Sequence, residues 1–260
     1  MQHLTMGTTM NKAPITAYIE GDTEDGVLAG LAKRGIIKAG LIEVGNKKGG
    51  KAEKHHALRL DLRAWFDEPL DARKPKSLLV IRDQDQHQPE QVVASVQDLL
   101  RPHLLNAGLA KHPEAEGVHQ LYDPASKLRL ALVIARWDGV ERFFPDISNH
   151  AMDDYVLALA MLRPTAAAML NERHESRRVL GVDKLLAKVQ TEIPDLLEKN
   201  GLAPFIYAKD HIRFYAALLG IPSSPVNFAT TVIKHADEAA LRSHFASLLA
   251  AVAFLSPPTT

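Results

Sequence analysis

The sequence predicts an α/β protein, with a mostly parallel sheet flanked by helices and a helical C-terminal half. Two observations support this prediction. Between Pro14 and Trp137, short apolar segments alternate with segments whose apolar residues recur at helical spacing. Such alternation is typical of right-handed βαβ crossovers, which build parallel sheets covered by helices on both faces. Beyond Trp137, nearly every segment has the helical period.

Four strands and three helices are expected in the first half. The strand segments are short and rich in β-branched residues, and the helical segments show apolar residues three and four positions apart. Pro89 stands in the first turn of the third helix, where proline is tolerated. The expected strands are residues 14–20, 40–45, 77–83 and 128–137, and the expected helices are 23–35, 51–66 and 88–105.

The second half is expected to be helical. Its helical segments are residues 150–164, 182–201, 208–220 and 237–255, and only residues 226–234 hint at an extended chain. We therefore divide the chain into a flexible N-terminal tail (1–13), an α/β domain (14–140) and a helical region packed on it (141–260).

Composition excludes several classes of protein. Lys plus Arg and Asp plus Glu both total 31, so the chain as a whole carries no field that would draw it to nucleic acid or a membrane, and an anionic partner must be held locally. The absence of cysteine excludes disulfides, a thiol nucleophile and thiolate zinc sites. No apolar run approaches the roughly 18 residues of a membrane span, and residues 1–12 lack the apolar segment expected of a signal peptide. A cytoplasmic protein without membrane contact is expected.

Acidic residues follow two of the predicted strands. Glu20 ends the first strand and precedes Gly21, and the third strand ends in Asp83-Gln-Asp85. The carboxyl ends of parallel strands meet at one edge of a sheet, and a side-chain period of two would turn both aspartates the same way. Carboxylates crowded together need a cation, and oxygen ligands suit Mg²⁺ or Mn²⁺. The alternative is that these residues cap helices or form turns.

A strand ending in Glu-Gly, an intervening strand with two helices, and an apolar strand ending in Asp-x-Asp together resemble the TOPRIM domain. The likeness covers roughly residues 14–137, and it aligns Glu20 with the TOPRIM glutamate and Asp83 and Asp85 with its aspartate pair. TOPRIM domains occur in primases, topoisomerases, recombination mediators and nucleases of the overcoming-lysogenization-defect type. The chain is too short for a topoisomerase DNA gate and lacks the cysteines of a primase zinc module.

Two later segments extend the resemblance to an uncharacterised bacterial TOPRIM-like family related to those nucleases. "FFPDISNHAMDDYVLALAM" is similar to a helix start that supplies a second group of metal ligands, here Asp153 with Asp154 beside it. "IYAKDHIRFYAALLG" resembles a block in which a lysine, here Lys209, precedes an aromatic-rich helix. Some such nucleases carry another acid after the first glutamate.

Three residues compete for that last position, namely Asp22, Glu24 and Asp25. We prefer Glu24, because it stands four residues after Glu20, in the first helical turn, and can reach back to the strand end; Asp25 could do the same.

Other candidates carry weaker signals. Lys47, Lys48 and Lys51 surround two glycines near the same sheet edge and could contact a nucleic-acid backbone, although a solvated loop explains them equally well. His87 and His150 lie close to the acidic motifs in sequence and could orient a water, although surface histidines are usually incidental.

The expected function is metal-dependent hydrolysis of phosphodiester bonds in nucleic acid, in DNA rather than RNA, with Mg²⁺ or Mn²⁺. The alternative is a non-catalytic TOPRIM-like binding or regulatory module, such as the partner of an ATPase in a defence system. The resemblance implies catalytic roles for Glu20, Asp83, Asp85 and Lys209, and metal binding by Glu20, Glu24, Asp83, Asp85 and Asp153.

Overall fold

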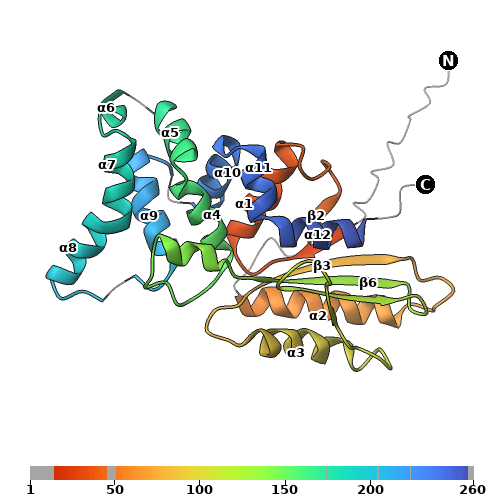
Figure 1. Ribbon diagram of the computed structural model, residues 1–260. Coiled ribbons are helices and arrows are strands. Elements are labelled where there is room, and N and C mark those ends of the chain that lie inside the picture. Colours follow the sequence, from red (N-terminus) through yellow and green to blue (C-terminus); the bar gives the residue numbers. More distant parts are fainter. Residues whose placement is uncertain (1–14, 46–50, 174, 204, 223, 257–260) are drawn as a thin grey trace, which may run out of the picture.

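The computed structural model describes residues 15–45, 51–173, 175–203, 205–222 and 224–256. It contains a six-stranded, mostly parallel sheet flanked by helices, followed by a helical C-terminal half, as the sequence predicts (Figure 1). The strands are β1 (Ile15–Tyr18), β2 (Ile42–Val44), β3 (Lys76–Asp83), β4 (Ala110–Lys111), β5 (Val118–Asp123) and β6 (Leu128–Ala135).

The strand order is β2-β1-β3-β6-β5-β4, and the first four strands in that order run parallel. β3 and β6 form the centre, where Asp83 is level with Ala135. β5 and β4 add an antiparallel edge. Neither of these two strands is among the four that the sequence predicts. The segment "VHQLYD" of β5 is half polar and reads weakly as a strand, so its pairing depends on the apolar β6 beside it.

Two apolar clusters cover the two faces of the sheet. One face packs against α2 (Lys51–Asp67) and α3 (Pro89–Leu100), which lie together below the sheet in Figure 1. The other face packs against α1 (Asp22–Lys33), α4 (Met152–Met161) and α12 (Ala246–Leu255). Side chains alternate between the faces along β3, so Leu79 and Ile81 belong to the second cluster while Leu78 and Val80 belong to the first.

The remaining helices pack on α1, α4 and α12 or on one another. They are η1 (Asp138–Arg142), α5 (Arg163–Asn171), α6 (Glu175–Arg178), α7 (Val182–Ala187), η2 (Lys188–Glu192), α8 (Ile193–Lys199), α9 (Ala208–Leu219), α10 (Pro225–His235) and α11 (Glu238–His244). In the described part of the chain, no single helix is long and apolar enough to cross a membrane. α11 and α12 reach that length and composition only together, and they are bent by 76° at their junction.

The extended conformation expected for residues 226–234 is wrong, because these residues form α10. Their β-branched residues favour a strand locally. However, Phe228, Ala229, Val232 and Ile233 recur at helical spacing and are buried. α10 packs closely on α1, where a Cβ on Gly26 would come within 3.0 Å of the Val226 backbone. Tertiary packing therefore overrides the local propensity.

Candidate functional site at the carboxyl edge of the sheet

The carboxyl ends of β1, β3 and β6 meet at one edge of the sheet, where ligands bind in many α/β proteins. Glu20 follows β1 by two residues, and Asp83 is the last residue of β3. The starts of α1 and α4 reach the same place, because Thr23 Oγ1 donates a hydrogen bond to Asp153 Oδ1 at 2.7 Å. Three separate segments therefore bring acidic side chains together.

Glu20 forms a buried ion pair with Arg82. Arg82 Nη1 lies 2.7 Å from Glu20 Oε1, and the two side chains are 7% and 5% exposed. The other carboxylate oxygen accepts a hydrogen bond from the Asp83 backbone N–H at 3.3 Å. Burial lowers the pKa of Arg82, while the charges of Glu20 and Asp83 raise it. The guanidinium thus compensates one negative charge at this edge.

Glu24 is almost fully buried, with 1% of the residue exposed. Its Oε1 accepts a hydrogen bond from the Gly21 N–H at 3.2 Å, as a helix-capping glutamate would. Burial, with a smaller contribution from the charges of Asp153 and Glu20, raises the pKa of Glu24 to about 7. The choice of Glu24 over the exposed Asp22 and the half-buried Asp25 thus selects the acid that lies among the others.

Asp83 lies close to the other carboxylates and contacts the start of α4. Its Oδ1 accepts a hydrogen bond from the Met152 N–H at 3.1 Å, so it satisfies a backbone donor at the start of α4. Burial raises the pKa of Asp83 well above its ordinary value, and the charges of Glu24, Glu20 and Asp153 add to this shift. We call Glu20, Glu24, Asp83 and Asp153 the carboxylate cluster.

Asp153 connects the carboxylate cluster to α9. Burial raises the pKa of Asp153, while the Thr23 hydrogen bond and the charges of Lys209 and Arg213 lower it. Lys209 stands in the first turn of α9, with its ammonium 4.4 Å from the centre of the Tyr207 ring. The charges of both α9 cations therefore act on Asp153, and the charge of Asp210 on the same helix opposes them.

Asp85 differs from the expectation. β3 ends at Asp83 and Asp85 adopts a left-handed φ of 52°, so the strand alternation that would turn both aspartates the same way stops before Asp85. Instead, the backbone of Asp85 pairs with that of His150, with N–H···O distances of 2.8 and 3.4 Å. Asn149 in turn forms a bridge with Tyr207. These contacts fix the start of α9 beside the carboxylate cluster.

His150 and Asp154 form a buried pair that the sequence did not reveal. His150 Nδ1 lies 2.8 Å from Asp154 Oδ2, and Nε2 lies 3.6 Å from Glu141 Oε1. Burial raises the pKa of Asp154 to about 6, although its hydrogen bond to His150 opposes the shift. The spacing of four residues is the one signal in the sequence, and it is common. His87 is exposed on the β3–α3 loop.

The predicted basic loop lies largely outside the described residues. Lys47 and Lys48 belong to the segment 46–50, and only the backbone of Lys51, at the start of α2, is described.

The chemistry of the carboxylate cluster fits a hard divalent cation, but its side chains are not arranged as a finished metal site. Four carboxylates, three of them with a raised pKa, are the oxygen donors that Mg²⁺ and Mn²⁺ prefer. Within the described residues, however, no three Asp, Glu or His side chains are placed to hold an ion. Glu20 is turned to Arg82 and Glu24 to Gly21. Cation binding therefore requires these two side chains to turn.

Comparison with known proteins adds no relative: no protein-family model, curated protein or solved structure matches this chain.

Stability should depend on pH through Glu24. Its pKa of about 7 in the folded protein exceeds its ordinary value of 4.5, so the folded state binds the proton more tightly. In EDTA, the free energy of unfolding should therefore fall as pH rises from about 5 to 8, by on the order of 3 kcal/mol. Urea denaturation at both pH values measures this change.

Glu24→Gln should reduce this pH dependence, because the amide oxygen can still accept from Gly21 but cannot ionise. Glu43→Gln, on the exposed face of β2, is the matched control and should keep the wild-type dependence. An unchanged dependence in Glu24→Gln would contradict the assignment.

Proposed function

We propose that this protein hydrolyses phosphodiester bonds in nucleic acid with the help of Mg²⁺ or Mn²⁺, and that the carboxylate cluster holds the cation. The observation that carries the proposal is the gathering of four acids from three segments at the carboxyl edge of a parallel sheet, with a raised pKa on Glu24, Asp83 and Asp153. Such an excess of buried negative charge is costly unless the acids protonate or a cation joins them.

The cation would supply an activated water and a polarised phosphate oxygen. Glu20, Glu24, Asp83 and Asp153 would provide its protein ligands, and Asp85 could join them from the adjacent loop. The resemblance to TOPRIM nucleases supports this assignment, because Glu20 and Asp83 belong to its motif. The same resemblance favours DNA over RNA as the substrate.

Lys209 and Arg213 would hold the substrate. Their charges already act on Asp153, so an anionic phosphate beside the carboxylate cluster would lie within their field. A fixed cation next to a phosphate stabilises the additional negative charge of the transition state. The chain has no net charge, so local cations of this kind must provide the attraction for nucleic acid.

One set of contacts favours a different function. Every member of the carboxylate cluster also has a partner within the protein, namely Arg82, the Gly21 and Met152 N–H groups, and Thr23. These contacts would equally serve a purely structural role, in which the carboxylates stabilise the packing of α1, β3 and α4. A non-catalytic TOPRIM-like module that binds or regulates a partner such as an ATPase would need only this structural role of the carboxylates.

Incubation with plasmid, single-stranded DNA and RNA, each with Mg²⁺ or Mn²⁺, distinguishes the two functions. We expect nicking or degradation that EDTA stops. Calorimetric titration with Mn²⁺ should show binding near neutral pH that weakens at pH 5, because a pKa of about 7 leaves Glu24 protonated there. Neither cleavage nor Mn²⁺ binding would favour the regulatory module.

A further inference from the structure

A large pocket lies beside the carboxylate cluster, at the same edge of the sheet. Its volume is about 930 Å³, which is within the usual range for small-molecule sites. The pocket spans the carboxyl end of β6, the loop before β5 and the junction of α11 and α12. Gln84, which stands between Asp83 and Asp85, forms part of its wall. The pocket and the carboxylate cluster therefore share one loop.

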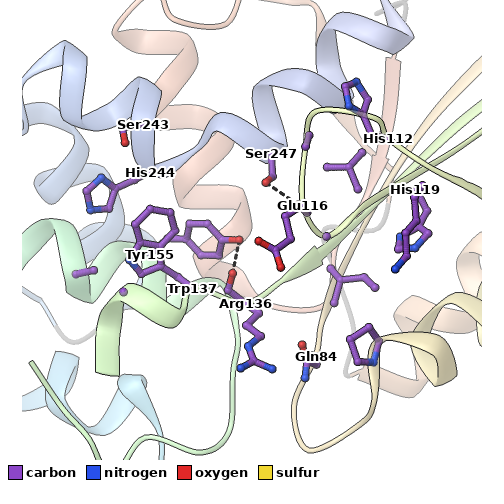
Figure 2. A pocket seen from close by; sticks show the side chains of 18 of the residues that line it. Gln84, His112, Glu116, His119, Arg136, Trp137, Tyr155, Ser243, His244 and Ser247 are labelled. Atoms are coloured by element: carbon purple, nitrogen blue, oxygen red, sulfur yellow. Dashed lines mark hydrogen bonds between the residues drawn. The ribbon is translucent and has the colours of Figure 1, made fainter. Parts of the chain in front are cut away.

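One wall of the pocket is aromatic. Trp137 stacks on His244 with ring centres 4.6 Å apart and planes 19° apart, and Tyr155 lies 5.4 Å from Trp137. Figure 2 shows these three rings together on one side, with His112 and His119 on the other and Glu116 between them. A Cβ on Gly139 would come within 2.3 Å of the Trp137 indole nitrogen, so the missing side chain leaves room for the indole.

Charged and polar groups complete the lining. Lys111, Arg136 and Arg142 contribute positive charge, and the carboxylate of Glu116 and the amide of Gln84 can hydrogen-bond a ligand. The hydrogen bond to Asp154 raises the pKa of His150, and the charge of Arg136 lowers it. Arg136 therefore lines the pocket and also lies close enough to His150, whose backbone pairs with Asp85, for its charge to act there.

His119 adds a buried polar group to the lining, and its ring must turn before a ligand can reach the unpartnered nitrogen. It lines the pocket and is 7% exposed, and its Nδ1 has no hydrogen-bond partner within the described residues. A buried polar atom without a partner is costly and uncommon in folded proteins. Burial lowers the pKa of His119, so the ring is neutral near pH 7 and can accept a hydrogen bond at one nitrogen and donate at the other.

We propose that this pocket binds a nucleotide, with the base against the Trp137–His244–Tyr155 wall and the phosphate near Arg136. A base can stack on aromatic rings and hydrogen-bond to Gln84, Glu116 and, after its ring turns, His119, and a phosphate suits the positive charge of Lys111, Arg136 and Arg142. The proposal rests on the function above in one respect: the nucleotide would be the end of the strand whose neighbouring phosphate reaches the carboxylate cluster.

Tryptophan fluorescence tests the pocket without catalysis. The chain has two tryptophans, and Trp65 lies in the other apolar cluster, where its Nε1 donates to the Lys74 carbonyl at 3.1 Å. In Trp65→Phe, the emission therefore comes from Trp137. In EDTA, we expect saturable quenching by a 5′-phosphorylated oligodeoxynucleotide and weaker quenching by AMP. Equal quenching by AMP would assign the pocket to free nucleotides, which overturns the strand-end role but keeps the site.

Two variants test the contacts by the anisotropy of a labelled oligonucleotide. Gly139→Val should displace the indole, and His119→Leu should remove the imidazole from the pocket lining. Each should weaken binding about tenfold, the effect of losing one stacking or hydrogen-bonding contact. His103→Leu, which removes a histidine stacked on Phe66 away from the pocket, should leave binding unchanged. Circular dichroism confirms that each variant is folded.

The outcomes separate this inference from the proposed function. Absence of quenching by both probes, or wild-type affinity in both folded pocket variants, overturns the pocket. Binding in EDTA by a protein that cleaves nothing supports the pocket and removes the nuclease. Cleavage without quenching of Trp137 supports the nuclease and overturns the pocket.

Discussion

Replacement of Asp83 by asparagine is expected to reduce metal-dependent cleavage by about a thousandfold or more. Asp83 is the acid on which the charges of Glu20, Glu24 and Asp153 all act, so a cation shared by these residues would lie next to it. A lost charged ligand removes several kcal/mol of transition-state stabilisation, which corresponds to this factor. Initial rates of plasmid nicking at saturating Mn²⁺ measure the change.

Asparagine is the informative substitution because its amide oxygen can still accept the Met152 N–H, which keeps the start of α4 in place. Asp71→Asn, on an exposed loop between α2 and β3, is the matched control and should cleave like the wild type. Undiminished cleavage by Asp83→Asn would point to a contaminating nuclease or to another site in the chain.

The position of Glu20 and Asp83 at one sheet edge follows from the sequence alone. Apolar strands separated by helices predict parallel pairing, and parallel pairing brings the ends of β1 and β3 together. Glu24 could also be chosen, because one helical turn returns the chain to the strand end. These predictions depend only on the periods of strands and helices, which local sequence determines.

Features that depend on tertiary contacts could not be predicted. Asp85 leaves the strand because its backbone pairs with His150, which is 65 residues away in the chain. The burial of Asp154 and its hydrogen bond to His150 depend on how α4 packs, and the β4–β5 edge depends on the surface that β6 offers. None of these contacts leaves a periodic signal in the sequence.

The alternation of side chains along β3 could have predicted that Arg82 has an acidic partner. Along β3, Arg82 shares a face with Leu78 and Val80, whereas Asp83 shares the opposite face with Leu79 and Ile81. A charged residue in an otherwise apolar strand implies an opposite charge nearby, since buried charges are normally paired. Glu20, two residues beyond the end of the adjacent strand β1, is that charge.

Arg82→Leu is expected to destabilise the protein by about 3 to 5 kcal/mol near pH 7, because it leaves Glu20 buried without its partner. Urea denaturation in EDTA measures the loss. The double variant Glu20→Leu/Arg82→Leu should recover most of the stability, since replacing both members of a buried pair by apolar residues of similar size is often close to neutral. Equal destabilisation in the single and double variants would mean that the guanidinium matters for its packing and not for its charge.

The same variant shows whether Glu20 can serve as a metal ligand. In the wild type, a cation must compete with Arg82 for the Glu20 carboxylate, which lies 2.7 Å from the guanidinium. In Arg82→Leu this competition is gone, so Mn²⁺ should bind more tightly and should restore stability by RT ln(1 + [Mn²⁺]/Kd). The double variant lacks the carboxylate and should respond less than the single variant. If Mn²⁺ stabilises neither variant, Glu20 acts only as the counter-ion of Arg82, and the carboxylate cluster only stabilises the packing of α1, β3 and α4.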